Sequence, residues 1–430
     1  MKMIRILPFF AALAVLFSGC LKDSCDRVVT YTKVEPVYRT WEEIRTTPIE
    51  MAAARPLENP GKIYTYQSYI FINEENAGIH VIDNSIPSAP QQIGFITLEG
   101  NEDISIKNGL LYANNYMDLV TIEVSNLPDI QVVGRTKNVF PVLWNDEENQ
   151  RILAYYDTEE VTEEMSCDEL STLEKTGNVY WSCLNCFDFF VWEDLSSSTN
   201  VSTGSSGGTG TGGSMARFSI VGDYLYVVDN TALKVFSLTS PPEATLANTV
   251  HVGWGIETLF PWQDKLFIGS NSGMFIFDNS NPTEPVLLSE FQHARACDPV
   301  FVKDNFAYVT LRDGTVCQGF VNQLDLIDIS DLTKPVLLRS FPMDNPHGLS
   351  IRDNTLLLCE GNFGLKTFDI ENPLILDQHL ADHVPTLHAF DVIALPGNDK
   401  IALVIGDDGF YQFDFSDPEH LELLSKIEVR

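Results

Sequence analysis

The chain has 430 residues, of which 60 are acidic and 27 are basic, so its formal net charge at pH 7 is −33. A surface of this charge repels the phosphate backbone of nucleic acids and anionic lipid headgroups. The composition therefore argues against nucleic-acid binding. The negative charge either keeps the protein soluble or favours a cation or a basic protein as a partner.

The N-terminus has the pattern of a targeting signal. Two basic residues precede an apolar run at residues 6–17, which is too short to span a bilayer and is typical of a signal peptide at residues 1–19. The sequence LFSGC, which ends at Cys20, resembles a bacterial lipobox. The resemblance implies cleavage before Cys20 and lipidation of its thiol; a plain secretory signal is the alternative.

The lipid would hold the mature protein at the outer membrane, on the cell surface or on the periplasmic face. Residues 20–59 are then a tether and lead-in to the folded part, with a turn of helix near residues 41–44.

One phrase recurs along the rest of the chain. GIHVIDNSIPSAPQQIGFI from Gly78, GMFIFDNSNPTEPVLLSEF from Gly273, QLDLIDISDLTKPVLLRSF from Gln323 and GFYQFDFSDPEHLELLSKI from Gly409 each indicate a strand, a turn and a strand. Two more apolar runs precede each phrase, so one unit has four short strands. The units begin near Gly61, Glu102, Asn138, Ala216, Glu257, Asp298, His347 and His388.

A repeat of four strands with a period of about 40 residues is the signature of a β-propeller blade. We therefore expect residues 60–430 to form an all-β propeller, in which eight blades are favoured. The third unit contains an insertion at about residues 157–214, and its third and fourth strands are acidic and not strand-like. If this unit forms no blade, the count is seven.

Two residue types mark the turns of each unit. The aspartate that ends the third strand can accept hydrogen bonds from backbone N–H groups one or two residues ahead. The glycine before the third strand is expected to have a positive φ. The aspartates are Asp83, Asp278, Asp328, Asp369 and Asp414, and the glycines are Gly78, Gly273, Gly364 and Gly409.

The units resemble the LVIVD repeat of bacterial and archaeal cell-surface proteins. The phrases GIHVID from Gly78, LDLIDIS from Leu324 and GLKTFDI from Gly364 carry this resemblance, which covers roughly residues 60–430. The lead-in and the insertion look like a Bacteroidetes branch of that family. The resemblance implies a propeller at a cell surface and implies no reaction, because the family has no defined catalytic set.

The mouth of the propeller channel is the expected ligand site. The side chains at the start of the first strands include Glu102, Asn138, Glu257, Asp298, His347 and His388. The loops between second and third strands add Glu74, Glu75, Asp118, Asp229, Asp313, Glu360, Asp407 and Asp408, which predicts an acidic rim. No cofactor is predicted; a divalent cation held by carboxylates, or by carboxylates and histidines, is one alternative, and a solvated polar mouth is the other.

The cysteines and the insertion give further candidates. Cys167 is expected to form a disulfide with Cys183 or Cys186, although a zinc site or a redox motif remains open. Cys297 and Cys317 are a second candidate pair. The insertion also contains aromatic residues that could contact a sugar or a protein, or cap the third blade.

A further cysteine, Cys359, lies in the apolar run LLLC and is expected to be a buried free thiol.

Two classes of function follow. The first is a monomeric, non-enzymatic surface lipoprotein that binds a protein, glycan or small ligand through the propeller rim. The second is a hydrolase or lyase that uses the acidic and histidine side chains of the mouth. The sequence contains no recognisable nucleophile–base motif, which favours the first class and assigns no catalytic residue.

Overall fold

The computed structural model describes residues 26–74, 76–166, 179–181, 211–292, 299–312, 321–396 and 400–430. The chain divides into a larger compact unit, residues 39–154 and 188–430, and a smaller one, residues 1–38 and 155–187. Across the described ranges, we find no helix of the length and apolarity that a membrane crossing requires.

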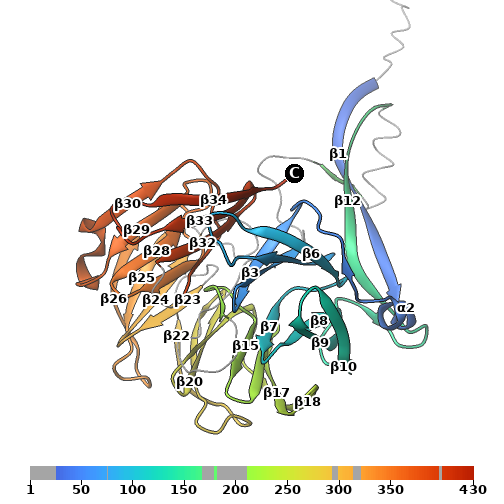
Figure 1. Ribbon diagram of the computed structural model, residues 1–430, viewed down its shortest axis with the longest axis horizontal. Coiled ribbons are helices and arrows are strands. Elements are labelled where there is room, and N and C mark those ends of the chain that lie inside the picture. The colour runs from blue at the N-terminus through green and yellow to red at the C-terminus, as the bar shows by residue number, and fades with distance from the viewer. Residues whose placement is uncertain are drawn as a thin grey trace, which may run out of the picture. The chain divides into compact units, whose positions relative to one another are not determined.

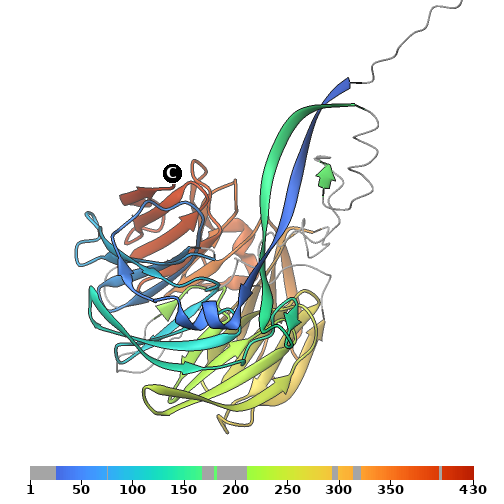
Figure 2. The same ribbon diagram turned by 90° about the vertical axis from the view of Figure 1, so that its right-hand side faces the viewer.

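The larger unit contains seven antiparallel sheets, each with four strands that follow one another in the chain, as expected for propeller blades (Figure 1, Figure 2). The first three are β3 (Pro60–Tyr66), β4 (Tyr69–Glu74), β5 (Gly78–Asp83) and β6 (Gln91–Thr97); β7 (Ile104–Lys107), β8 (Leu110–Asn115), β9 (Asp118–Asn126) and β10 (Asp129–Thr136); and β15 (Phe218–Val221), β16 (Tyr224–Val228), β17 (Ala232–Ser240) and β18 (Glu243–His251). The first sheet has two further strands, β2 (Met51–Ala52) and β14 (Thr211–Gly212), at its edges.

The next two sheets are β19 (Ile256–Trp262), β20 (Lys265–Ser270), β21 (Gly273–Asp278) and β22 (Val286–Gln292); and β23 (Val300–Lys303), β24 (Phe306–Leu311), β25 (Gln323–Asp328) and β26 (Val336–Pro342). The last two are β27 (Leu349–Arg352), β28 (Thr355–Cys359), β29 (Leu365–Asp369) and β30 (Leu380–Val384), with the 3-10 helix η3 (Pro373–Gln378); and β31 (Asp391–Ala394), β32 (Ile401–Gly406), β33 (Gly409–Asp414) and β34 (Glu422–Glu428).

The first strands of these sheets contact one another in chain order. Strand β3 contacts β7, β7 contacts β15, and the series continues through β19, β23 and β27 to β31. Strands β31 and β32 then contact β3, which closes the ring. The all-β propeller predicted from the sequence is therefore present.

The described part of the chain contains eight sheets, and the ring itself is formed by the seven with consecutive strands. The remaining sheet has the order β11 (Asn145–Asp146), β12 (Arg151–Ser166), β1 (Asp26–Thr40) and β13 (Val179–Trp181). It falls at the third sequence unit, the one whose ability to form a blade was open. The eight sheets agree with the number favoured from the sequence, and seven of them, those with consecutive strands, make the ring contacts given above.

Strand β12 corrects one expectation. The segment VTEEMS was not expected to be a strand, yet β12 continues through it to Ser166. Its acidic side chains, such as Glu159 and Glu160, are exposed, so the segment lacks the apolar alternation from which strands are predicted. In the smaller unit β1 pairs with β13, and the Tyr31 hydroxyl donates to Glu163 Oε1 at 2.6 Å.

The lead-in contains the short helix that the sequence predicted. Helix α2 (Trp41–Thr46) begins with a capping box, in which Thr40 Oγ1 accepts from Glu43 N–H and the Glu43 carboxylate accepts from Thr40 N–H. A short strand, β2 (Met51–Ala52), then pairs with β6 at the outer edge of the first sheet.

The blades bury both of their faces, which explains the continuous apolar runs. In β21, Met274 and Ile276 pack into the cluster shared with the β23–β26 sheet, whereas Phe275 and Phe277 pack toward the β15–β18 sheet. Successive side chains of a strand point to opposite faces, so a strand between two neighbouring blades needs apolar residues at every position.

The turn aspartates have the predicted role. Asp83, Asp278, Asp328, Asp369 and Asp414 each accept a hydrogen bond from the backbone N–H two residues ahead, at 2.7–3.0 Å. The glycine prediction is correct for Gly78 (φ 148°) and Gly364 (φ 85°) and wrong for Gly273 and Gly409. At Gly273 the reason for glycine is space, because a Cβ would lie 2.5 Å from the carbonyl oxygen of Phe291 in β22.

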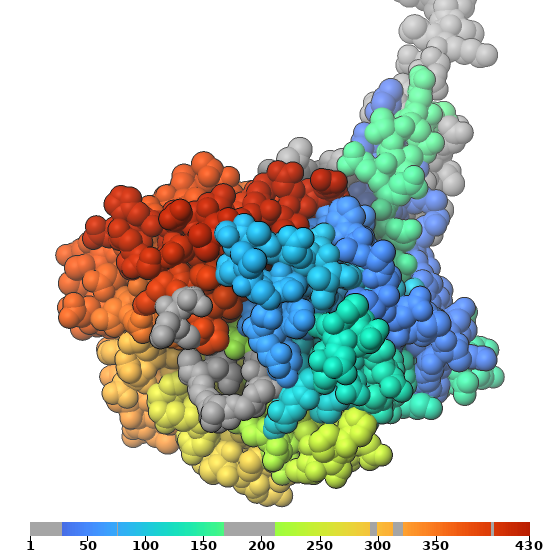
Figure 3. All heavy atoms as spheres, in the orientation of Figure 1, coloured from blue at the N-terminus to red at the C-terminus, as the bar shows by residue number. Residues whose placement is uncertain are grey.

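The first and last sheets of the ring are joined directly. Leu57 forms a parallel bridge with Val429, and Arg430 N–H donates to Leu57 O at 2.8 Å. Between the two sheets lies an apolar cluster that includes Ile63 and Phe410. Figure 3 shows the C-terminal strands in red directly beside the first sheet in blue.

Candidate functional site at the channel mouth

A segment of the chain itself fills the axis of the ring. Residues 211–216 lead into β15, and β14 (Thr211–Gly212) adds to the inner edge of β3. Ser214 Oγ accepts from the backbone N–H of Leu349 in β27 at 2.7 Å, and Ala216 O accepts from Leu259 N–H in β19 at 2.8 Å. Because one short segment reaches the innermost strands of three sheets, it must cross the channel. We call residues 211–216 the axial segment.

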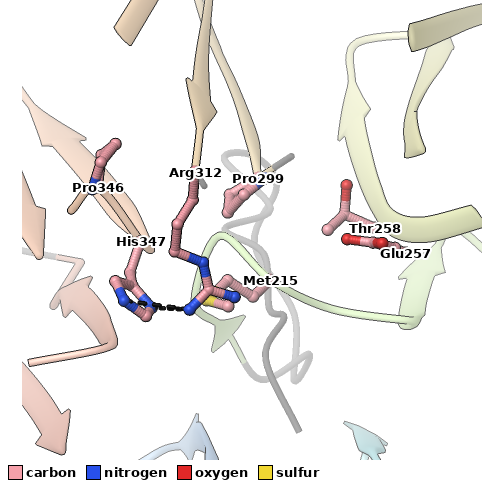
Figure 4. Close-up of a pocket in the computed structure, with 7 residues that line it drawn as sticks. All are labelled: Met215, Glu257, Thr258, Pro299, Arg312, Pro346 and His347. Carbon is pink, nitrogen blue, oxygen red and sulfur yellow. Dashed lines mark hydrogen bonds between the residues drawn. The ribbon is translucent and has the colours of Figure 1, made fainter. Parts of the chain in front are cut away.

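A small hollow, open to solvent and with room for about one water molecule, lies beside the axial segment (Figure 4). Strand β19, the loops that lead into β23 and β27, and the end of β24 all contribute side chains to it. Its lining consists of Met215, Glu257, Thr258, Pro299, Arg312, Pro346 and His347. The hollow therefore contains two residues of the predicted rim, Glu257 and His347.

His347 holds Arg312 at the side of this hollow. Arg312 Nη1 lies 2.9 Å from His347 Nδ1 and 3.1 Å from His347 Nε2 (Figure 4). His347 Nε2 also lies 2.5 Å from Asn345 Oδ1. An amide oxygen can only accept, so Nε2 carries the proton that is donated to Asn345 Oδ1. A guanidinium can only donate, so Nδ1 is the acceptor for the nearer contact of Arg312. Burial, the charge of Arg312 and the nearby His388 hold the pKa of His347 well below its ordinary value.

His388 lies next to His347 and has different surroundings. The two imidazole centroids are 6.4 Å apart at 74°. His388 Nδ1 accepts from Asp407 N–H at 3.1 Å, and Nε2 lies 3.5 Å from the exposed Asp407 carboxylate. The backbone N–H of His388 donates to Asp408 Oδ1 at 3.2 Å. The second predicted histidine therefore reaches the mouth, on the side of the last sheet.

A buried charge network connects the first strands of the first three sheets. Asp103 accepts three backbone N–H groups, from Ile104, Arg217 and Phe218, at 2.7–3.0 Å. Lys62 Nζ lies 3.6 Å from Asp103 Oδ2 and is almost fully buried.

The other half of this network is Arg217, whose Nη1 pairs with the half-exposed Glu102 at 3.1 Å. Burial lowers the pKa of Lys62, and Asp103 opposes this effect. Lys62 and Arg217 come from sheets that are separated by the sheet of Asp103, so they approach each other on the channel side.

Asn138 is not brought to the mouth. Its Oδ1 accepts from Arg45 Nη2 at 2.7 Å, and its backbone N–H donates to Asp118 Oδ1 at 2.9 Å. The sequence unit that Asn138 opens does not enter the ring, so its first residue has no place among the innermost strands. Asp298, Glu75 and Asp313 lie outside the described residues.

The rim presents less negative charge to solvent than expected, because several of its carboxylates are buried and bonded to basic side chains within the fold. Glu360 accepts from Asp344 and Asn345 N–H groups and pairs with Lys366 Nζ at 2.9 Å. The other buried members are Glu74, Asp118 and Asp229, bonded to His80, to Arg45 and Arg135, and to Lys234. Among the residues that the structure describes, no group of three or more His, Cys, Asp or Glu is arranged to hold a metal ion.

Three cations at the mouth were missed by the sequence analysis: Lys62, Arg217 and Arg312. Lys62 and Arg217 each come one residue after the start of a repeat unit, at Gly61 and Ala216. The second position of each repeat unit would therefore have pointed to both residues. Arg312 follows a second strand, and only the contact between neighbouring sheets brings it to His347.

The candidate disulfide cysteines, Cys167, Cys183, Cys186, Cys297 and Cys317, and the lipidation candidate Cys20 lie outside the described residues. The aromatic side chains of the insertion, residues 179–192, also lie outside the described side chains. Cys359 is a buried free thiol, as expected, and burial raises its pKa.

Comparison with known proteins identifies the repeats. The LVIVD repeat family matches residues 212–235, 266–292 and 294–342, so the chain contains LVIVD repeats. No curated protein matches the chain.

Similar solved structures include the computationally designed Ika8 protein, at 10% identity and a TM-score of 0.46, over 89% of this chain and 91% of that chain. A functionally unknown protein from Desulfotomaculum acetoxidans DSM 771 matches at 12% identity and a TM-score of 0.45, over 86% and 95% of the two chains. Hsv2 from Kluyvelomyces marxianus matches at 12% identity and a TM-score of 0.45, over 84% and 96%. Similarities at this level of identity concern the fold alone.

Proposed function

We propose that this chain, a β-propeller that contains LVIVD repeats, is a non-enzymatic binding scaffold anchored to the outer membrane through lipidated Cys20. The ligand is held at the channel mouth, where Glu257, Arg312 and His347 line a hollow that is open to solvent. The lipobox-like LFSGC supports the anchor, and the propeller supports a scaffold with a ligand site at its mouth.

The observation that carries the proposal is the state of His347. Both of its ring nitrogens are engaged: Arg312 Nη1 lies 2.9 Å from Nδ1 and 3.1 Å from Nε2, and Asn345 Oδ1 lies 2.5 Å from Nε2. A general base needs a nitrogen that can reach the proton of a substrate or a water. Since His347 is committed to orienting Arg312, the arrangement favours recognition by fixed donors and acceptors over proton transfer.

The axial segment supports the same conclusion. It occupies the channel next to the hollow, so the mouth is shallow and a ligand cannot pass through the ring at this level. A shallow rim with fixed polar groups suits a protein segment or the end of a polymer.

The test is a pull-down from outer-membrane and periplasmic extracts with the purified lipidated protein. We expect a partner that is recovered by the wild type and lost with Glu257→Gln or Arg312→Ala. The matched control is Arg339→Ala, which removes a partly exposed arginine of the outer strand β26 that pairs with Asp377 of η3. Equal recovery by all variants would place the ligand elsewhere.

The competing hydrolase or lyase reading has a direct assay. Turnover of glycoside, ester or polyuronide substrates by the wild type, abolished by His347→Ala, would replace the binding proposal. For the anchor, we expect Cys20→Ser to release the protein from the membrane fraction, and proteinase treatment of intact cells to distinguish the surface from the periplasmic face.

A further inference from the structure

Trp254 differs from the other tryptophans whose side chains are described. It is 74% exposed, whereas Trp41 and Trp144 each lie under an arginine, at 5.3 and 5.5 Å, and Trp262 packs edge-on against Phe267. Within the described ranges, the Trp254 indole takes part in no hydrogen bond, ring contact or cation–π contact. A large aromatic side chain that is exposed and makes no such contact contributes little to folding, and such side chains are typical of binding interfaces.

The backbone around Trp254 is held in place. Val252 and Gly253 N–H groups donate to Thr231 O at 3.0 and 3.3 Å, and Asn271 N–H donates to Gly255 O at 2.9 Å. Gly255 has a φ of 66°, and a Cβ there would meet the Asn271 side chain at 2.3 Å. The indole is therefore presented by a fixed loop, which lowers the entropy cost of binding a ligand on it.

The loop places Trp254 at the mouth. It leads directly into β19, an innermost strand, and Trp254 is three residues before Glu257, which lines the hollow. Three residues span at most about 11 Å, so the Cα atoms of Trp254 and Glu257 lie within that distance of each other. Two further bonds, from Ile256 N–H to Asn230 O and from Leu259 N–H to Ala216 O, fix the start of the strand.

We propose that Trp254 and Glu257 form a docking site for an arginine or lysine side chain in a basic segment of a partner protein. The inference rests on the proposed binding function and adds the chemical class of the partner. Tryptophan has the strongest attraction of the aromatic side chains for a cation above its face, and a nearby carboxylate adds an ion pair.

The charge of the molecule favours this partner. The net charge of −33 attracts a basic segment and raises its rate of association, at moderate ionic strength. Two arginines of the mouth would repel a basic segment, and each already contacts another side chain. Arg217 is paired with Glu102, and the Arg312 guanidinium, which lines the same hollow as Glu257, lies against His347.

The test uses the full lipidated protein in detergent and the peptide Gly-Arg-Gly-Arg-Gly, with its uncharged citrulline analogue as the matched probe. We expect the arginine peptide to quench tryptophan fluorescence and to bind more tightly than the analogue. Trp254→Ala should weaken binding roughly threefold to thirtyfold, Trp254→Phe should weaken it less, and Glu257→Gln should also weaken it. Trp144→Ala, which removes a partly exposed tryptophan elsewhere in the larger unit, should leave binding unchanged.

Equal affinity of the wild type and Trp254→Ala for the arginine peptide would overturn the proposal, because binding would then reflect only the overall negative charge. Quenching by a neutral hexasaccharide that depends on Trp254, without a response to the peptide, would also overturn it in favour of a glycan site. If Trp254→Ala recovers the pull-down partner as the wild type does, while Arg312→Ala does not, the mouth remains the binding site and only the docking role of Trp254 fails.

Discussion

His347 is buried between Arg312 and Asn345, and this position makes one residue sensitive to pH. A proton on Nδ1 would replace the bond from Arg312 by repulsion, and His388 lies 6.4 Å away. The cost of burying an imidazolium beside an arginine is the reason that the pKa of His347 is held low. The same residue that orients the mouth therefore limits its stability in acid.

We expect the stability of the larger unit to fall as the pH drops from about 7 to about 5. The unfolded state takes up a proton near pH 6.5 and the folded His347 does not, so stability is complete above that pH and decreases below it, by up to about 1.4 kcal/mol per pH unit. Urea unfolding at several pH values measures this. His347→Gln should flatten the profile between pH 7 and 5, and the exposed His420→Gln should not change it.

Asp103 is the residue on which the innermost strands of two sheets converge. Its carboxylate accepts three backbone N–H groups and also lies next to the buried Lys62. We expect Asp103→Ala to lower the free energy of unfolding by about 3 kcal/mol, because three donors and one buried cation lose their acceptor.

The matched control is Asp223→Ala, which breaks an ion pair of an exposed carboxylate with Lys107 and should change stability by about 0.5 kcal/mol or less. Urea midpoints of the two variants decide the comparison. Similar losses in both would mean that the buried network adds nothing to the ring.

At the level of elements, the repeated unit is specified by local sequence signals, whereas the axial segment is specified by long-range contacts. The unit depends on local signals: an apolar run, an aspartate that bonds the backbone two residues ahead, and a close approach of strands that requires Gly273. The axial segment depends on partners far away in the sequence, in β3, β19 and β27. Its glycines and serine are small enough to pass where the inner strands of the sheets approach one another.

We expect Ser214→Ala to lower the free energy of unfolding by about 1 kcal/mol, since Leu349 N–H loses its acceptor at a buried position. Hydrogen exchange should show the clearer effect, with faster exchange of the Leu349 amide. Ser416→Ala, which changes an exposed serine in a turn of the last sheet, should leave that amide as it is. An unchanged Leu349 amide in the Ser214→Ala protein would contradict the contribution assigned to the axial segment.

At the level of the whole molecule, the ring is completed by two ends of the chain that are far apart in sequence. Leu57 and Val429 bridge, and the cluster around Ile63 and Phe410 is shared by the first and last sheets. Blades of this kind have two apolar faces, so an open ring would expose one face at each end. Closure therefore stabilises every blade through its neighbours.

We expect deletion of residues 422–430, which removes β34, to prevent cooperative folding and to cause aggregation. The deletion exposes the edge of β33 and removes apolar side chains from the closing cluster. Removal of Arg430 alone should cost about 1 kcal/mol, because only its bond to Leu57 O is lost. Thermal melts by circular dichroism and size-exclusion chromatography measure both; a folded, monomeric deletion protein would contradict this account of closure.

The sequence by itself determined the propeller, the order of strands within each unit, the turn role of Asp278 and its equivalents, and the burial of Cys359. Each of these follows from local patterns: period-two apolar runs, turn chemistry at fixed offsets and a repeat near 40 residues. It also placed Glu257, His347 and His388 at the mouth, because those residues begin innermost strands.

Only the tertiary structure decided which sequence units enter the ring. It thereby decided that Asn138 does not lie at the mouth. It also decided that the axial segment fills the channel, that carboxylates such as Glu360 are used within the fold, and that Arg312 meets His347. These features depend on contacts between sheets that are distant in sequence, and on burial, which changes the charge state and the available bonds of a side chain. A repeat pattern states that a residue lies near the axis, but the neighbours that meet it there are set by how the sheets pack.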